Sequence, residues 1–266
     1  MVKLDTIHLE KLNELQEVIE RRTISRFEQI ADMAQTIDQT DICSETTFYI
    51  HDTSHWSTDY NSIVFDAHRG IHKTKMTTKK LINRYARSKE ANFLLMQAMG
   101  RQLSVNRCWP YVLGSIQFAP TGGPVKDSTH WVAVHHMKDI YKDPADEKRI
   151  YIVFDGGYRL NVRVDFKTFH RKLEMVRRYY DFQLDLTKYL VGQFNGEVHL
   201  LPSDSYLATR IPRSPDLETS EYQNCREILI RIAHQVFRTM NPEDYHFDIL
   251  DMEDVYKDTL RDKAML

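Results

Sequence analysis

The stretch Ile150–Phe166 reads IYIVFDGGYRLNVRVDF and decides the fold class of the chain. Two apolar runs rich in β-branched residues flank an Asp-Gly-Gly triplet. Glycine adopts positive φ without strain, so this triplet is typical of a tight hairpin turn. In the second run apolar and polar residues alternate, and the apolar set is Tyr158, Leu160, Val162 and Val164. The stretch therefore predicts an antiparallel β-hairpin with one buried face.

A helix is expected directly after the hairpin, over residues 167–191. Its apolar stripe is Phe169, Leu173, Val176 and Tyr180, at the three- and four-residue spacing of one helix face. From Gly156 to Tyr180 the chain carries seven Lys or Arg and two acids, a formal charge of +5. This part of the chain is thus expected to present a basic surface, and its candidate phosphate ligands are Arg171, Lys172 and Arg178.

Further strands are predicted upstream of the hairpin. Residues 46–66 contain TTFYI and NSIVF joined by a polar turn. Residues 103–119 predict two more strands, of which the first contains Pro110 and is expected to be an edge strand or a bent strand. Residues 130–140 predict one strand, centred on Trp131–Val134. Strands in this number beside long helices predict an α+β protein with a mixed or antiparallel sheet core and basic helices.

Helical extensions are expected at both ends of the chain. Residues 1–41 keep a helical apolar spacing with a break near 21–25, and Ser220 is placed to cap a helix that runs to Thr239. Both ends are acidic, with a formal charge of −7 over residues 1–59 and −5 over 241–266. We therefore divide the chain into an N-terminal helical extension (1–42), a core (43–205) and an acidic, helical C-terminal extension (206–266).

The middle of the chain holds its most basic stretch, His68–Arg107. This stretch has ten Lys or Arg and one acid, a formal charge of +9, although the whole chain carries only −2. A cluster of cations attracts phosphate, because each cation brought to a nucleic-acid backbone releases condensed counterions. A solvated helix face is the alternative explanation, but such a face normally includes neutralising acids.

Within this stretch Thr77 or Thr78 is expected to cap a helix that runs to about Ala91. An apolar segment, Phe93–Met99, follows and is expected to end at Gly100–Arg101. Lys79, Lys80, Arg84 and Arg87 are the candidate phosphate ligands, and Arg101 and Arg107 are candidates for insertion into a groove. The full candidate set from this stretch is Lys73, Lys75, Lys79, Lys80, Arg84, Arg87, Arg101 and Arg107.

No motif indicates catalysis, a metal or a cofactor. The chain has 266 residues and three widely spaced cysteines, Cys43, Cys108 and Cys225, which favour a reducing compartment over a disulfide framework. His51, Asp52 and His55 have a composition that can bind metal, although a polar hairpin loop that contains histidines is the commoner explanation. His130 and His136 lie roughly 20 Å apart along the expected strand, too far to share a zinc ion. We expect no enzyme, no signal peptide and no membrane span, hence a soluble cytoplasmic protein.

Several short motifs, in order, resemble the bacterial competence transcription factor family (ComK-like). Phe118-Ala119-Pro120-Thr121 resembles the family's Phe-Pro-Thr turn with one inserted residue. The other matching elements are Lys79-Lys80-Leu81-Ile82, Gly100-Arg101, Cys108-Trp109-Pro110, His130-Trp131, His135-His136-Met137, and the hairpin and basic helix from Gly156 to Tyr180. The resemblance covers roughly residues 44–205. His130 stands where the family usually has cysteine, and the N-terminal helix and much of the C-terminal region are extra.

The resemblance implies a DNA-binding activator of DNA-uptake (competence) genes that acts in the cytoplasm, at the nucleoid. Such a protein would bind A/T-rich boxes of double-stranded DNA through phosphate and minor-groove contacts, as a homodimer or a pair of dimers. It would also meet RNA polymerase and a Clp-protease adaptor, and the segment nearest to the family's adaptor-recognition motif is Val198, His199, Leu200, Leu201 and Pro202. A buried strand end explains that segment equally well.

Two other functions remain open from the sequence. One is a metal-dependent nuclease that uses Asp155 and nearby histidines on DNA, although the hairpin turn explains Asp155 without chemistry. The other is a regulatory interaction module whose acidic ends mask the basic centre.

Overall fold

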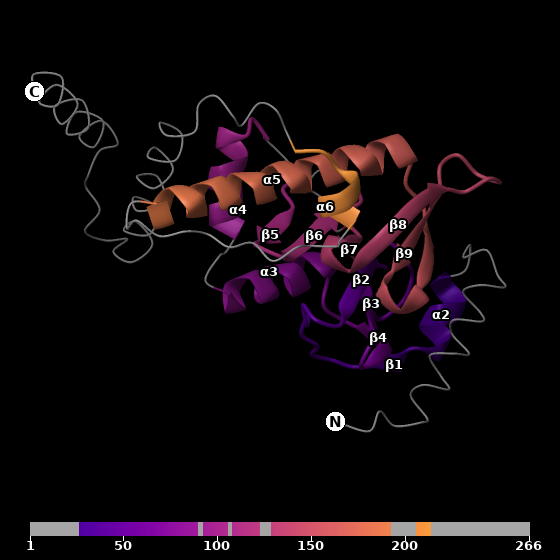
Figure 1. Cartoon of the computed structure of the whole chain (residues 1–266). Coiled ribbons are helices and arrows are strands. Elements are labelled where there is room, and N and C mark those ends of the chain that lie inside the picture. Colours follow the sequence, from indigo (N-terminus) through magenta and orange to yellow (C-terminus); the bar gives the residue numbers. More distant parts are fainter. Residues whose placement is uncertain (1–26, 90–92, 106–107, 123–128, 193–205, 214–266) are drawn as a thin grey trace, which may run out of the picture. The chain divides into compact units, whose positions relative to one another are not determined.

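The computed structural model describes residues 27–89, 93–105, 108–122, 129–192 and 206–213 (Figure 1). All of them belong to one compact unit of the chain, residues 1–225. The expected helices before residue 26 and over 220–239 lie outside the described residues.

A seven-stranded sheet forms the larger β-structure and places the strands in the order β1-β4-β3-β2-β7-β6-β5. The short β1 runs parallel to β4, and every other neighbouring pair is antiparallel, so the sheet is mixed. The strands are β1 (Gln35–Thr36), β2 (Thr47–Asp52), β3 (Ser62–Asp66), β4 (Gly70–Thr74), β5 (Tyr111–Leu113), β6 (Ile116–Pro120) and β7 (Trp131–Ala133). The expected α+β class with a mixed sheet is confirmed.

A second sheet has three antiparallel strands, β8 (Met137–Lys142), β9 (Ile150–Phe154) and β10 (Arg159–Val162). The predicted hairpin is its β9–β10 pair. Gly156 and Gly157 adopt φ values of 76° and 81°, which only glycine reaches without strain. The Phe154 N–H donates to the Tyr158 carbonyl at 2.8 Å and closes the turn. Leu160, Val162 and Val164 are buried, as the alternation predicted, whereas Tyr158 is only half-buried and Asn161, on the predicted polar face, is 1% exposed.

The prediction of a single strand over residues 130–140 is wrong. The chain leaves the large sheet after Ala133, makes a 3₁₀ turn over Val134–His136 and enters the small sheet at Met137. The two histidines of the turn both donate from Nε2 to the Ser44 carbonyl at 2.8 Å. The Gln117 N–H donates to Nδ1 of His135 at 3.1 Å. These tertiary hydrogen bonds outweigh the local preference for an extended strand.

Five helices accompany the sheets in the described part of the chain: α2 (Phe27–Met33), α3 (Thr78–Ser88), α4 (Phe93–Gln102), α5 (Phe166–Gly192) and α6 (Tyr206–Arg210). The long α5 crosses α4 in Figure 1 and packs on β5 and β6. Its Tyr179 hydroxyl donates to the Met96 carbonyl at 3.1 Å, and Arg178 donates to the Leu103 carbonyl at 2.9 Å. These bonds fasten α5 to α4.

Several boundaries differ from the sequence-based prediction. The helix expected to reach residue 41 ends at Met33 and is followed by β1. The helix α4 continues through Gly100–Arg101 to Gln102, and α6 was not predicted. The most basic stretch includes a strand, β4, because its backbone pairs with β3 and β1 whatever the charge of its side chains. Among the described helices, none has the length and apolar character needed to cross a membrane.

Candidate nucleic-acid interface

Helix α3 carries the main group of exposed cations. The Thr77 hydroxyl accepts a hydrogen bond from the Lys80 N–H at 3.2 Å, so the predicted cap is confirmed. One side of the helix is buried through Thr78, Leu81, Ile82, Tyr85 and Ala86. Lys79, Lys80, Arg84 and Arg87 are exposed. We call Lys80, Arg84 and Arg87 the cationic stripe, since a spacing of four and then three residues places them on one helix face.

The charge of this helix is poorly compensated. Its first turn contains no acid, and two lysines stand there although the helix dipole favours negative charge at this end. In the described ranges, Lys79, Lys80 and Arg87 form no ion pair. Arg84 does, because its Nε lies 2.8 Å from a carboxylate oxygen of Asp41. Within the described residues, three of the four cations thus lack an acidic partner.

Two other candidate cations are used inside the fold. The Lys73 ammonium donates to the Ala31 carbonyl at 2.8 Å and lies 5.1 Å from the centre of the Tyr60 ring. The Arg178 guanidinium holds the Leu103 carbonyl at the end of α4. Both side chains fasten a helix to its neighbour, which leaves them poorly placed to bind phosphate.

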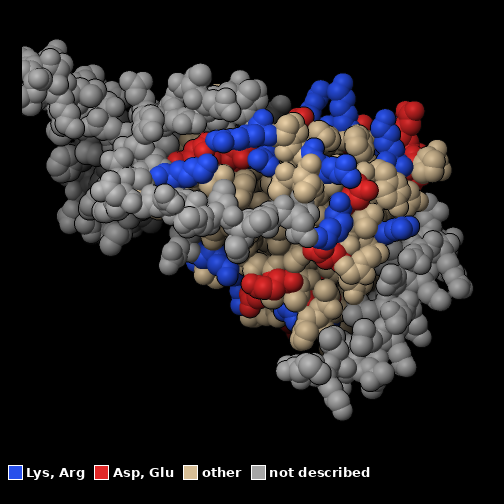
Figure 2. All heavy atoms as spheres, in the orientation of Figure 1, with Lys and Arg blue, Asp and Glu red and all other residues tan. Residues whose placement is uncertain are grey.

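The remaining candidates are spread over several elements. Lys75 is exposed in the β4–α3 connection, where its carbonyl accepts a hydrogen bond from Asn61 at 2.7 Å. Arg101 and Arg171 are exposed on α4 and α5, and Lys172 is half-buried on α5. On the face in Figure 2, Lys and Arg side chains are interspersed with Asp and Glu. Arg107 and the expected adaptor segment 198–202 lie outside the described residues.

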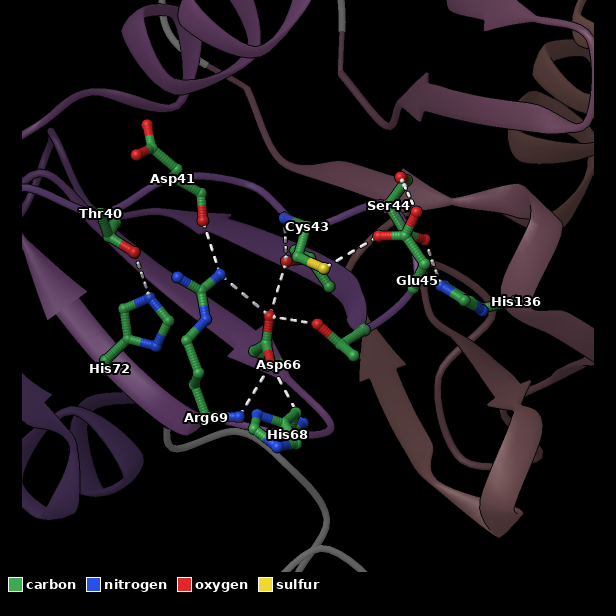
Figure 3. A network of polar contacts seen from close by, with 12 residues as sticks. Thr40, Asp41, Cys43, Ser44, Glu45, Asp66, His68, Arg69, His72 and His136 are labelled. Carbon is green, nitrogen blue, oxygen red and sulfur yellow. Dashed lines mark hydrogen bonds and ion pairs between the residues drawn. The ribbon is translucent and has the colours of Figure 1, made fainter. Parts of the chain in front are cut away.

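A buried acid, Asp66, holds the segment that contains Asp41 (Figure 3). Asp66 is 1% exposed and accepts hydrogen bonds from the Arg69 N–H at 2.8 Å and the Arg69 guanidinium at 3.1 Å. The same guanidinium donates to the Asp41 carbonyl at 2.6 Å. Burial raises the pKa of Asp66, but the hydrogen bonds from Arg69, Thr47 and Thr46 outweigh it and hold this pKa below its ordinary value. Asp66 is therefore an anion at neutral pH and fixes Arg69.

The sequence analysis missed Asp41 and Asp66 as parts of this site. Asp41 and Arg84 are 43 residues apart in the chain, so no local spacing pattern relates them. The one available signal was general: few acids lie near α3 in the sequence, so a partner for any of its cations has to come from a distant part of the chain.

Histidines gather at the ends of β2 and β7 without forming a metal site. His51 stacks between Phe27 and His130, with ring centres 3.9 Å and 4.3 Å away. The Asp52 N–H donates to Nδ1 of His130 at 2.9 Å, so this nitrogen carries no proton. Burial lowers the pKa of His130 to about 4 and that of His51 well below its ordinary value. No cluster of three or more His, Cys, Asp or Glu in the described ranges is arranged to hold a metal ion.

Asp155, the carboxylate of the nuclease hypothesis, makes an ion pair. Its carboxylate lies 3.1 Å from the Lys138 ammonium and 3.9 Å from Nδ1 of His136. The turn glycines beside it explain its position in the hairpin. The structure therefore gives Asp155 a local role.

Comparison with known proteins identifies no relative. No family model matches the chain, and no significant match exists among curated proteins or solved structures.

Proposed function

We propose that this protein is a DNA-binding transcriptional activator of competence genes. The observation that carries the proposal is a set of exposed cations on α3, of which only Arg84 has an acidic partner among the described residues. The set is Lys79, Lys80, Arg84 and Arg87. The resemblance of residues 44–205 to the competence transcription factor family supplies the A/T-rich target and the activator role. It also supplies the further partners, which are a second copy of the chain, RNA polymerase and a Clp-protease adaptor at 198–202.

The geometry of α3 suits the sugar–phosphate backbone. At about 1.5 Å of rise per residue, the cationic stripe from Lys80 to Arg87 is about 10 Å long and can meet two or three phosphates. Phosphate contacts of this kind fix the position of a protein on DNA but carry no sequence information. Preference for A/T-rich boxes would come from the narrow minor groove, whose negative potential attracts arginine, and exposed Arg101 is the candidate in the described part.

The test is a titration of A/T-box duplex DNA at several salt concentrations. We expect the pair Lys79→Gln and Lys80→Gln to reduce the magnitude of the slope of log K against log salt by about 1.8, or about 0.9 for each lost phosphate contact. The matched control is Lys148→Gln with Lys188→Gln, which removes the same charge from exposed positions on other elements. This control is expected to leave the slope nearly unchanged.

Equal slopes for the wild type and the α3 variant would contradict the proposal. A second arm incubates the same duplex with Mg²⁺ or Mn²⁺. Cleavage that disappears in Asp155→Ala would replace the proposed function with the metal-dependent nuclease.

A further inference from the structure

One cation of α3 already has an anionic partner. Arg84 binds Asp41 through Nε at 2.8 Å, whereas Lys79, Lys80 and Arg87 make no ion pair in the part of the chain that the structure describes. Asp41 belongs to the acidic segment 1–59, whose formal charge is −7. The middle position of the cationic stripe is thus occupied by an acid from a distant part of the chain.

We propose that Asp41 is an intramolecular competitor that holds Arg84 until a DNA phosphate displaces it. This inference rests on the proposed function, since it concerns how the same helix is kept from unselective binding. A carboxylate is the natural substitute for a phosphate oxygen here, because the guanidinium binds both through its N–H groups.

The backbone of Asp41 is held in place independently of its carboxylate. The Arg69 guanidinium bridges the Asp41 carbonyl and the buried Asp66 carboxylate (Figure 3). Neighbouring residues add further bonds, since the Thr40 hydroxyl meets Nε2 of His72 at 2.7 Å and the Asp38 carbonyl accepts from the Thr74 hydroxyl at 3.0 Å. The Asp41 side chain can therefore swing away from Arg84 while its main chain stays in place.

The Asp41–Arg84 pair is weak enough to be displaced. The side chains of Arg84 and Asp41 are 46% and 65% exposed, and water screens such pairs strongly. A DNA phosphate competes effectively with the Asp41 carboxylate for Arg84, because neighbouring phosphates of the same duplex bind the other cations of α3. Loss of the competitor should therefore tighten DNA binding by only about two- to fivefold.

The decisive experiment is a double-mutant cycle on the full chain, read as the dissociation constant for A/T-box duplex DNA at one fixed salt concentration. Asp41→Asn keeps the shape of the side chain and removes its charge, and we expect it to tighten binding by about two- to fivefold. In an Arg84→Gln background the same change is expected to have no effect, because nothing remains for Asp41 to block.

The matched control is Asp38→Asn, which removes one exposed charge three residues away, where no ion pair to α3 exists in the described residues. Its effect is expected to be clearly smaller, because the removed charge is not in contact with Arg84. Urea unfolding checks that each variant is folded. We expect Asp41→Asn to keep nearly the stability of the wild type, because the Arg69 guanidinium binds the Asp41 carbonyl and the Asp66 carboxylate and not the Asp41 carboxylate.

Three results would overturn the inference while leaving DNA binding in place. They are unchanged or weaker binding by Asp41→Asn, tightening that persists in the Arg84→Gln background, and equal tightening by Asp38→Asn. Failure of the wild type to bind duplex DNA in a salt-dependent manner is a different result, because it removes the proposed function as well.

Discussion

A single glycine sets how closely α4 approaches its neighbours. A Cβ at Gly100 would meet the Tyr179 hydroxyl and lie 2.9 Å from the Trp109 indole. Both groups are engaged, since Tyr179 donates to the Met96 carbonyl and Trp109 to the Val105 carbonyl. Neither ring can move without losing a hydrogen bond, so a side chain larger than that of glycine is costly at this position.

We expect Gly100→Ala to lower the free energy of unfolding by about 1–3 kcal/mol, the usual cost of overpacking a core. Urea denaturation measures the change. In a Tyr179→Phe background the penalty should shrink, because the hydroxyl nearest to the new methyl group is gone. A stabilisation of about 1 kcal/mol, as alanine gives in an exposed helix, would contradict this packing account.

At the residue scale, the sequence predicts those features that depend only on residues a few positions away. The Thr77 cap and the positive φ of Gly156 and Gly157 follow from side chains within a few positions. The Asp41–Arg84 pair and the role of buried Asp66 did not follow, because their partners are distant in sequence or lie in the protein interior. The prediction that Lys73 binds DNA stays untested. The hydrogen bond from its ammonium group to the Ala31 carbonyl could not be predicted from composition.

At the scale of elements, helices were easier to predict than the ends of strands. The stripes of α3 and α5 are regular over several turns, and both helices appear close to the predicted positions. The strand β4 was missed because its alternation is short and includes His72 and Lys73. The break after Ala133 depends on His135 and His136 bonding to Ser44, which local propensity cannot reveal.

The N-cap of α3 provides a direct test at this scale. We expect Thr77→Ala to lower the free energy of unfolding by about 1 kcal/mol, since the Lys80 N–H loses its acceptor. Thr77→Ser retains a hydroxyl and should behave almost as the wild type. Thermal or urea unfolding distinguishes the two variants, and equal stability of Thr77→Ala and the wild type would show that the cap contributes nothing.

At the scale of the whole molecule, buried neutral histidines make the fold sensitive to acid. Burial lowers the pKa of His130 from an ordinary 6.5 to about 4, and the pKa values of His51, His72 and His135 are lowered too. In the unfolded chain these groups bind protons at a higher pH than in the folded protein. The contribution of His130 to stability is therefore complete above about pH 6.5 and is lost as the pH falls toward 4, and the contributions of the other three histidines change in the same direction.

For His130 we expect the free energy of unfolding to fall by at most about 1.4 kcal/mol per pH unit within that window. Urea denaturation at pH 7, 6, 5 and 4 measures this dependence. His130→Gln should flatten the profile, while His68→Gln, at an exposed position, should not. A wild-type free energy of unfolding that stays constant from pH 7 to pH 5 would show that the buried histidines have the same pKa values in the folded and the unfolded chain.

The outermost strands of the large sheet are short. In the described residues β1 has two residues and β5 has three, and Pro110 directly precedes β5. An edge strand offers unpaired N–H and C=O groups on which another chain can add a strand, and brevity is one way in which proteins limit such addition. The large sheet thus offers little template for edge-to-edge aggregation of the protein at high concentration.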